Sequence, residues 1–290
     1  AFRKYVVKNM IPLVEATDDD CNEMAILLLC SLSSYEDCTD IIVESGMLRI
    51  IDAGATFNHK SLAVAYLTMF GNIANSGGMR SKILNERSLD KMRQICMQDD
   101  PSIDLTVIKT IYSLSCALEN LPKLCEYEVI SLLEMLWMNS TPEVRTEEYI
   151  YYLVASLYNL TVDLNTQAKV VSSGLVGLLM ELWPEAKKQS KSCILASKAV
   201  LNLGCGNVNT CRLVTDGAAT VLTFISDRKK GSEYQNYPFN YEMIHRTSAC
   251  LRNILSVQSN QKTMVSSGCL ISLMEIAHQS EKSIHGSDPL

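Results

Sequence analysis

Four asparagines recur in a pattern that could serve binding chemistry. In each case an apolar residue follows eleven positions later, and in three of the four a glycine follows fifteen positions later. A carboxamide carries two N–H donors and one acceptor, so it can bond both the N–H and the C=O of an extended peptide. A row of such side chains would hold a peptide backbone without dictating its sequence. The four residues are Asn72, Asn159, Asn202 and Asn253.

The same frame extends into the first half of the chain. Ser31 and Ser113 stand at the corresponding positions, which places six anchors at 31, 72, 113, 159, 202 and 253, spaced by 41, 41, 46, 43 and 51 residues. Gly46 follows the first anchor at the expected offset, whereas Arg87 and Glu128 stand where glycine is expected. Six anchors in one frame indicate an internal repeat of about forty residues.

Each repeat predicts helices. Apolar residues in the segments before the anchors, such as 146–160 and 241–255, recur at spacings of three and four, which is typical of an amphipathic helix. A second apolar run, such as 175–182, follows the glycine, which suits a helix C-cap with positive φ. We therefore expect a short, a medium and a long helix in each repeat. Three prolines are expected to precede long helices: Pro101, Pro142 and Pro184.

Composition excludes several classes of protein. The chain has 290 residues, of which 47% are hydrophobic and 20% are charged, so wholesale disorder is excluded. Its net charge of −6 argues against a nucleic-acid surface, which needs basic residues. No apolar run reaches about 18 residues, so we expect no membrane span. The chain begins at Ala1 rather than Met, which suggests a trimmed fragment and leaves an upstream lipid anchor open.

Catalytic and metal-binding patterns are weak. Gly204-Cys205-Gly206 resembles a phosphate loop but follows a predicted helix rather than a strand. The eleven cysteines include no C-x-x-C pair, and the four histidines lie far apart. We therefore expect no enzyme, no cofactor and no metal. The cysteines read as reduced thiols, which favours a cytoplasmic location, with the nucleus as an additional one.

The anchors favour one repeat family. Periods of about 40–47 residues built from two or three helices are typical of HEAT and armadillo arrays. The long helix that ends in Asn-Leu or Asn-Ile, followed by a polar stretch and a glycine, resembles the armadillo repeat family. The resemblance implies an all-α, right-handed superhelix over residues 1–279, and it leaves 227–238 as a mobile insertion and 280–290 as a polar tail. About six three-helix repeats and a partial C-terminal cap would follow, at 2–34, 35–76, 77–117, 118–162, 163–205, 206–257 and 258–279.

The resemblance also implies a site. In armadillo proteins the long helices line a concave groove, and positions four, seven and eleven before each anchor share its face. Importin-α proteins carry Trp four residues before most anchors, which this chain lacks, so a nuclear-import receptor of that kind is not expected. Groove lysines and arginines are closer to β-catenin, whose basic side chains face acidic partners. The candidate partner-binding residues are Asn72, Asn159, Asn202, Asn253, Ser113, Lys109, Lys198, Tyr152 and Arg246.

The predicted function is a non-enzymatic scaffold or adaptor that binds an extended protein segment, acidic or phosphorylated, in the groove. Several alternatives stay open. The anchor asparagines could bond a neighbouring helix and serve structure alone. The chain could instead regulate a folded partner such as a small GTPase through a surface patch, or act as a divergent nuclear-transport adaptor. An enzyme is the least favoured interpretation.

Overall fold

The computed structural model describes residues 2–14, 18–46, 48, 60–76, 78–97, 100–204, 209–226, 241–271 and 274. Every regular element within these ranges is a helix, so the predicted all-α class is confirmed. In the parts of the chain that the structure describes, no helix combines the length and the apolarity needed to cross a bilayer. The expected insertion at 227–238 and the tail at 280–290 lie outside the described residues. The chain divides into two units, Ala1–Ser156 and Leu157–Leu290.

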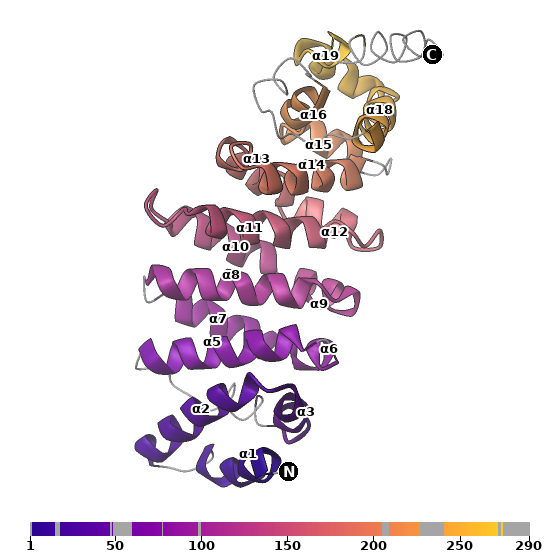
Figure 1. The fold of residues 1–290 in the computed structure, drawn as a ribbon. Helices are drawn as coiled ribbons and strands as arrows, with labels where there is room; N and C mark the ends of the chain where they lie inside the picture. The colour runs from indigo at the N-terminus through magenta and orange to yellow at the C-terminus, as the bar shows by residue number, and fades with distance from the viewer. Residues whose placement is uncertain are drawn as a thin grey trace, which may run out of the picture. The chain divides into compact units, whose positions relative to one another are not determined.

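Unit 1 holds the helices of the first half of the chain (Figure 1). From residue 80 onward, the helices of unit 1 follow the predicted order, in which shorter helices precede a long one. The helix α11 begins in this unit and continues past its boundary. The elements are α1 (Phe2–Val14), α2 (Asp19–Ser33), α3 (Glu36–Glu44), α5 (Lys60–Asn75), α6 (Arg80–Ile83), α7 (Glu86–Cys96), α8 (Pro101–Ser115), the 3-10 helix η1 (Leu118–Asn120), α9 (Leu121–Glu126), α10 (Val129–Asn139) and α11 (Glu147–Leu160).

Unit 2 continues in the same order, with two shorter helices before each long one. The long segment predicted at 241–255 coincides with the observed helix. The elements are α12 (Gln167–Ser172), α13 (Leu175–Ala186), α14 (Ser190–Gly204), α15 (Thr210–Thr215), α16 (Ala219–Ser226), α18 (Tyr241–Leu255) and α19 (Gln258–Ser266).

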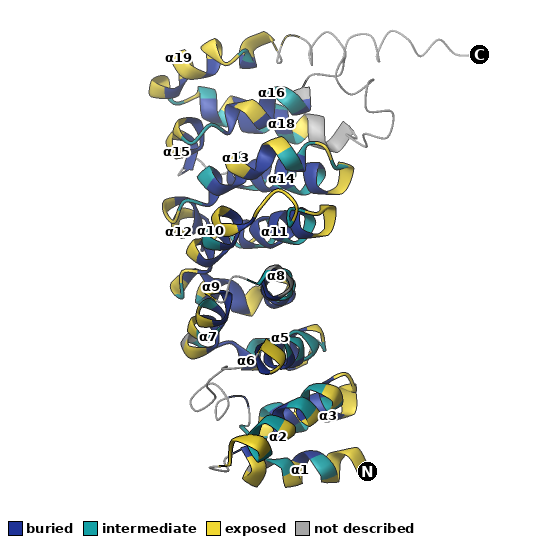
Figure 2. Cartoon of the chain, turned by 90° about the vertical axis from the view of Figure 1, so that its left-hand side faces the viewer, coloured by how far each residue is buried: buried dark blue, intermediate teal, exposed yellow. Residues whose placement is uncertain are grey.

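Long helices pack against long helices within unit 1. In Figure 1, α5, α8 and α11 lie side by side in chain order, and α2 packs against α5. Tyr66 and Phe70 of α5 are fully buried, with their ring centroids 5.7 Å apart. Figure 2 shows buried residues where helices face one another and exposed residues at the helix ends. The apolar stripes seen in the sequence therefore form the contacts between helices, although some polar residues of the long helices, such as Thr110 and Ser156, are buried with them.

The predicted glycine turns adopt the expected backbone conformation. Gly46, Gly174, Gly217 and Gly268 have φ values of 77°, 92°, 93° and 82°. Glu128 occupies the equivalent position after the third anchor and takes the same left-handed conformation, with φ of 56°. Arg87 does not, because α6 ends at an extended Leu84 and α7 has already begun at Glu86. The left-handed turn is thus kept without glycine after the third anchor and is absent after the second.

A recurrent hydrogen bond that sequence reasoning missed ties four of the long helices to the segments after them. Asn120 donates to the carbonyl of Leu114 at 3.0 Å, six residues earlier, and also to that of Arg80 at 3.1 Å. The same six-residue return bond satisfies a carbonyl at the end of the preceding long helix in other repeats. The further pairs are Arg80 to Ala74, Gln167 to Thr161 and Asn260 to Ile254.

The three prolines differ in their positions. Pro101 begins α8, and Pro142 lies in the turn before α11, as predicted. Pro184 does not end α13 but lies inside its last turns, because the helix continues to Ala186. Pro184 lacks the N–H that would bond the carbonyl of Met180, and the burial of Trp183 and Ala186 keeps the last turn of α13 helical in spite of that loss.

Candidate functional site

A polar hollow surrounds the first predicted asparagine. It has a volume of about 570 Å³ and lies where α2 and α5 end and α3 begins. Asn72 projects from α5 and is half-buried, and its Nδ2 donates to Ser33 Oγ at 3.0 Å. Asn75, one turn further, accepts from Ser113 Oγ at 2.7 Å. The hollow is lined by hydroxyls, amides and one carboxylate, from Ser33, Ser34, Glu36, Thr39, Asn72, Asn75 and Ser76.

The carboxamide of Asn72 keeps unused hydrogen-bonding capacity. Among the described residues, none donates to its Oδ1, and one of its two N–H groups is also unused. An amide with one acceptor and one donor left can bond a peptide C=O and N–H at the same time. This is the predicted chemistry of the anchor, placed at the edge of an open polar hollow.

The amide nitrogens also connect neighbouring long helices. Asn202 of α14 donates to Thr161 Oγ1 at 3.0 Å, and Asn253 of α18 donates to the carbonyl of Gly204 at 3.4 Å. In unit 1, Asn72 makes the equivalent bond to Ser33. Asn159 is half-buried near the end of α11 and is also engaged in an interaction. The amide nitrogens of Asn72, Asn202 and Asn253 therefore make the bonds to neighbouring helices that a purely structural role requires. The amide oxygens of these residues are a separate question.

Sequence reasoning did not identify the partners of these bonds. Ser33 and Thr161 each lie two residues after an anchor, and each meets the Asn of the next anchor along the chain. A hydroxyl at this offset was visible in the sequence, but its role depends on two long helices lying side by side. Both hydroxyls also donate to a carbonyl of their own helix, three residues back, as serine and threonine often do.

In unit 1, α8 and α11 bring three predicted residues close together. Lys109 Nζ lies 2.7 Å from Glu148 Oε1 and 5.4 Å from the centroid of the Tyr152 ring. Tyr152 meets Tyr112 edge-on, with centroids 5.2 Å apart, and burial raises the pKa of Tyr112 to about 12. Ser113 lies one turn beyond Lys109 on the same helix. Because Lys109 is already paired, an acidic guest would have to displace Glu148.

In unit 2, two predicted cations lie near Asn202. Arg246 Nη2 of α18 donates to Asn202 Oδ1 at 2.7 Å. Lys198 lies one turn before Asn202 on α14, so the two side chains share a face. Neither Lys198 nor Arg246 forms an ion pair with any described residue.

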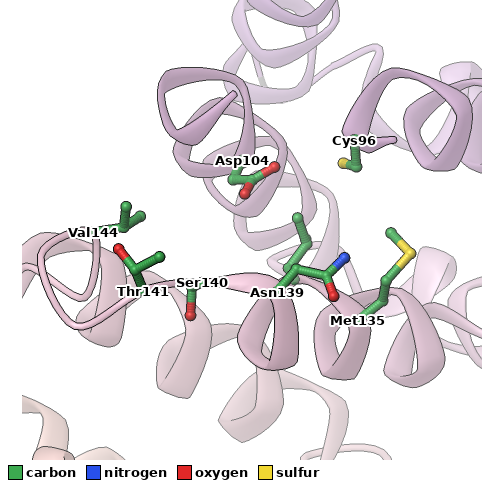
Figure 3. A pocket seen from close by; sticks show the side chains of 8 residues that line it. Cys96, Asp104, Met135, Asn139, Ser140, Thr141 and Val144 are labelled. Carbon is green, nitrogen blue, oxygen red and sulfur yellow. The ribbon is translucent and has the colours of Figure 1, made fainter. Parts of the chain in front are cut away.

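A second hollow, not anticipated from the sequence, lies among α7, α8 and the end of α10 (Figure 3). Its volume is about 430 Å³, and the carboxylate of Asp104, only 8% exposed, lies beside it with the thiol of Cys96. Burial, and then the negative charge of Asp104, raise the pKa of Cys96 to about 12. The thiol is therefore protonated at neutral pH and is not a nucleophile.

Within the described ranges, no group of three His, Cys, Asp or Glu side chains could hold a metal ion. The described cysteines form no disulfide, and Cys205 lies outside the described residues. The Gly204 that began the apparent phosphate loop ends α14 and packs against Cys250 of α18, so it serves helix packing.

Comparison with known proteins identifies the fold alone. No protein family profile matches the chain, and no curated protein matches it. Three crystal structures of engineered proteins from the Northeast Structural Genomics Consortium are similar. The first has a TM-score of 0.63 at 16% identity and covers 86% of this chain and 96% of its own. The second has a TM-score of 0.66 at 17% identity, and the match covers 92% of this chain and 62% of that one. The third has a TM-score of 0.62 at 16% identity, and the match covers 87% of this chain and 99% of that one. These similarities support an all-helical, repeat-like architecture.

Proposed function

We propose that this chain is an armadillo-type repeat protein whose long helices form a face that binds an extended segment of a partner protein. It acts as a non-enzymatic scaffold in the cytoplasm or nucleus. The repeated order of helices, the spacing of the anchors and the positive φ at five equivalent turns support the repeat assignment. A single repeat cannot bury its apolar faces alone, so the long helices of neighbouring repeats stack and present their polar positions together.

The observation that carries the proposal is the state of Asn72. Its nitrogen is held by Ser33, which fixes the orientation of the side chain, and its oxygen faces no described donor. A guest peptide passing through the 570 Å³ hollow could give an N–H to that oxygen and take the remaining N–H of the amide. The surrounding hydroxyls and amides favour a hydrated peptide backbone over an apolar ligand. Preorganisation of the amide reduces the entropic cost of binding.

The experiment compares two substitutions that break the same intramolecular bond. Peptides that bind the full chain are selected from a random 12-residue display library, and their affinities are measured by fluorescence anisotropy. Asn72→Ala removes both the structural bond and the proposed guest contacts, so we expect affinity to fall roughly tenfold. Ser33→Ala removes the bond that orients the amide and one hydroxyl of the hollow but keeps the amide itself, so affinity should fall by no more than about twofold.

Two results would contradict the proposal. The first is that no peptide is enriched over a control helical protein of similar size and charge. The second is that Asn72→Ala and Ser33→Ala weaken binding equally, because Asn72 would then contribute only to structure. Circular dichroism of both variants checks that the helices are retained.

A further inference from the structure

Two anchor asparagines of this chain are in different hydrogen-bonding states. Asn72 has an open amide oxygen, as described above. Asn202 is bonded at both ends, because its nitrogen donates to Thr161 and its oxygen accepts from Arg246 at 2.7 Å. While Arg246 stays in place, it occupies one of the two lone pairs of the Asn202 oxygen, so a guest backbone N–H would have to share that oxygen with a cation. The same residue type at the same repeat position thus has an unoccupied oxygen in one unit and an occupied one in the other.

Arg246 is held there by a weak partner. Its only hydrogen bond in the described structure is to a neutral amide, and it has no described carboxylate partner. The side chain of Glu242, one turn earlier on α18, lies outside the described side chains. A guanidinium attracts a carboxylate or phosphate by charge as well as by hydrogen bonding, and it can bond either group through two parallel N–H groups. An oxyanion arriving near Arg246 would therefore draw it away from Asn202.

Lys198 adds to the attraction for an oxyanion. It lies four residues before Asn202 on α14, where side chains are about 5–6 Å apart at Cβ. It is half-buried and, like Arg246, has no described anionic partner. Two cations beside one occupied amide oxygen favour the approach of an acidic peptide over that of a neutral one.

We propose that Arg246 makes Asn202 an oxyanion-gated subsite for acidic or phosphorylated peptide segments. A carboxylate or phosphate side chain of the guest takes the guanidinium of Arg246. The amide oxygen of Asn202 then accepts a backbone N–H of the same guest. The inference rests on the proposed peptide-binding function and adds to it the chemistry of the guest and the residue that selects it.

The test starts from a peptide selected from the display library. Each of its positions is replaced in turn by Gln, by Glu and by phosphoserine, which gives three series of peptides. For the wild-type chain we expect the best Glu and phosphoserine peptides to bind about tenfold more tightly than the Gln peptide. Glu and phosphoserine distinguish the two sources of the oxyanion. Arg246→Met removes the donor but keeps an unbranched side chain of similar length. It should weaken the acidic peptides and strengthen the neutral one, so that the preference disappears.

Arg252→Met is the matched control, because it removes the same charge from the exposed last turn of α18. It should keep the preference for acidic peptides. Attraction by charge alone predicts that Arg246→Met leaves the neutral peptide unchanged, so a gain for that peptide distinguishes gating from attraction. If Arg246→Met does not fold, Arg246→Gln replaces it, and loss of the acidic preference is again expected.

The inference is overturned if Arg246→Met weakens acidic and neutral peptides alike, or leaves both unchanged. When this happens while Asn72→Ala still impairs binding and Ser33→Ala does not, the peptide-binding proposal stands and only the gate is wrong. Absence of any peptide binding to the wild-type chain refutes both.

Discussion

Gly204 lies so close to α18 that an added methyl group has no room. A Cβ built at this position would be 2.0 Å from Sγ of Cys250 and 3.4 Å from its Cβ. Gly204→Ala therefore requires either α14 and α18 to separate or the buried Cys250 side chain to leave its position. Overpacking of this kind costs about 1–3 kcal/mol, which exceeds the roughly 0.5–1 kcal/mol that alanine gains over glycine in a helix. We expect a net loss of stability of about 1–2 kcal/mol.

A second substitution tests whether the sulfur is the cause. Cys250→Ala alone removes a fully buried sulfur and should cost about 1 kcal/mol. In the double variant the new Cβ of residue 204 meets the Cβ of residue 250 at 3.4 Å and Cδ1 of Leu213 at 3.9 Å, which are ordinary contact distances. The double variant should then be about 1–2 kcal/mol more stable than the two single effects predict. Urea unfolding followed by circular dichroism measures all four proteins. Additive effects, or a Gly204→Ala variant as stable as wild type, would refute the reasoning.

Three further predictions concern the backbone and the core. Glu128→Gly should raise the urea midpoint, because it relieves about 1–2 kcal/mol of left-handed strain. Gly174→Ala should lower the midpoint, although a Cβ there meets nothing within 4 Å; an opposite sign for either variant would contradict the turn geometry. Asn120→Asp should cost about 3 kcal/mol or more in urea unfolding, since two buried carbonyls lose their donor and face a carboxylate; a neutral effect would count against the return bond. Unfolding free energy should fall as the pH rises from about 9 to about 12, because the Cys96 thiol keeps its proton only when folded. Cys96→Ala should reduce that slope in urea titrations at pH 8 and 10, and an unchanged slope would refute the assignment.

The helices and their turns could be predicted because their causes are local. Apolar spacing along 146–160 places the helix that the structure has at Glu147–Leu160, and the glycine offset identifies the left-handed turns. The repeat frame also predicts the left-handed turn at Glu128, although glutamate rarely adopts a positive φ. Pro184 precedes the long helix α14 as predicted, but α13 extends past it to Ala186, because the packing of α13 on its neighbours outweighs the local tendency of proline to end a helix.

The hydrogen-bond partners of the candidate site could not be predicted in the same way. Arg246 and Asn202 are 44 residues apart, and Lys109 and Glu148 are 39 apart. Their contacts depend on how two helices pack and on which rotamers that packing allows. Sequence alone named Lys109, Arg246 and Asn202 as candidates, but it could not show that one cation is neutralised and that the other closes an amide.

The double role of the anchors also affects the design of experiments. Alanine at Asn202 or Asn253 removes a bond between neighbouring long helices as well as any guest contact. Lost binding in such variants would not separate recognition from folding. The pair of Asn72→Ala and Ser33→Ala makes this separation, because only one of the two changes the amide itself.

The six-residue return bond has a consequence for how such a chain can evolve. Its donors, such as Asn120 and Asn260, are buried at the start of the following helix and take no part in the exposed face of the long helices. Under the proposed function, mutations on that face would alter ligand preference without loosening the joints. Exchanging whole segments between repeat proteins of this kind at these joints should then produce hybrid proteins that fold while differing in the peptide they bind.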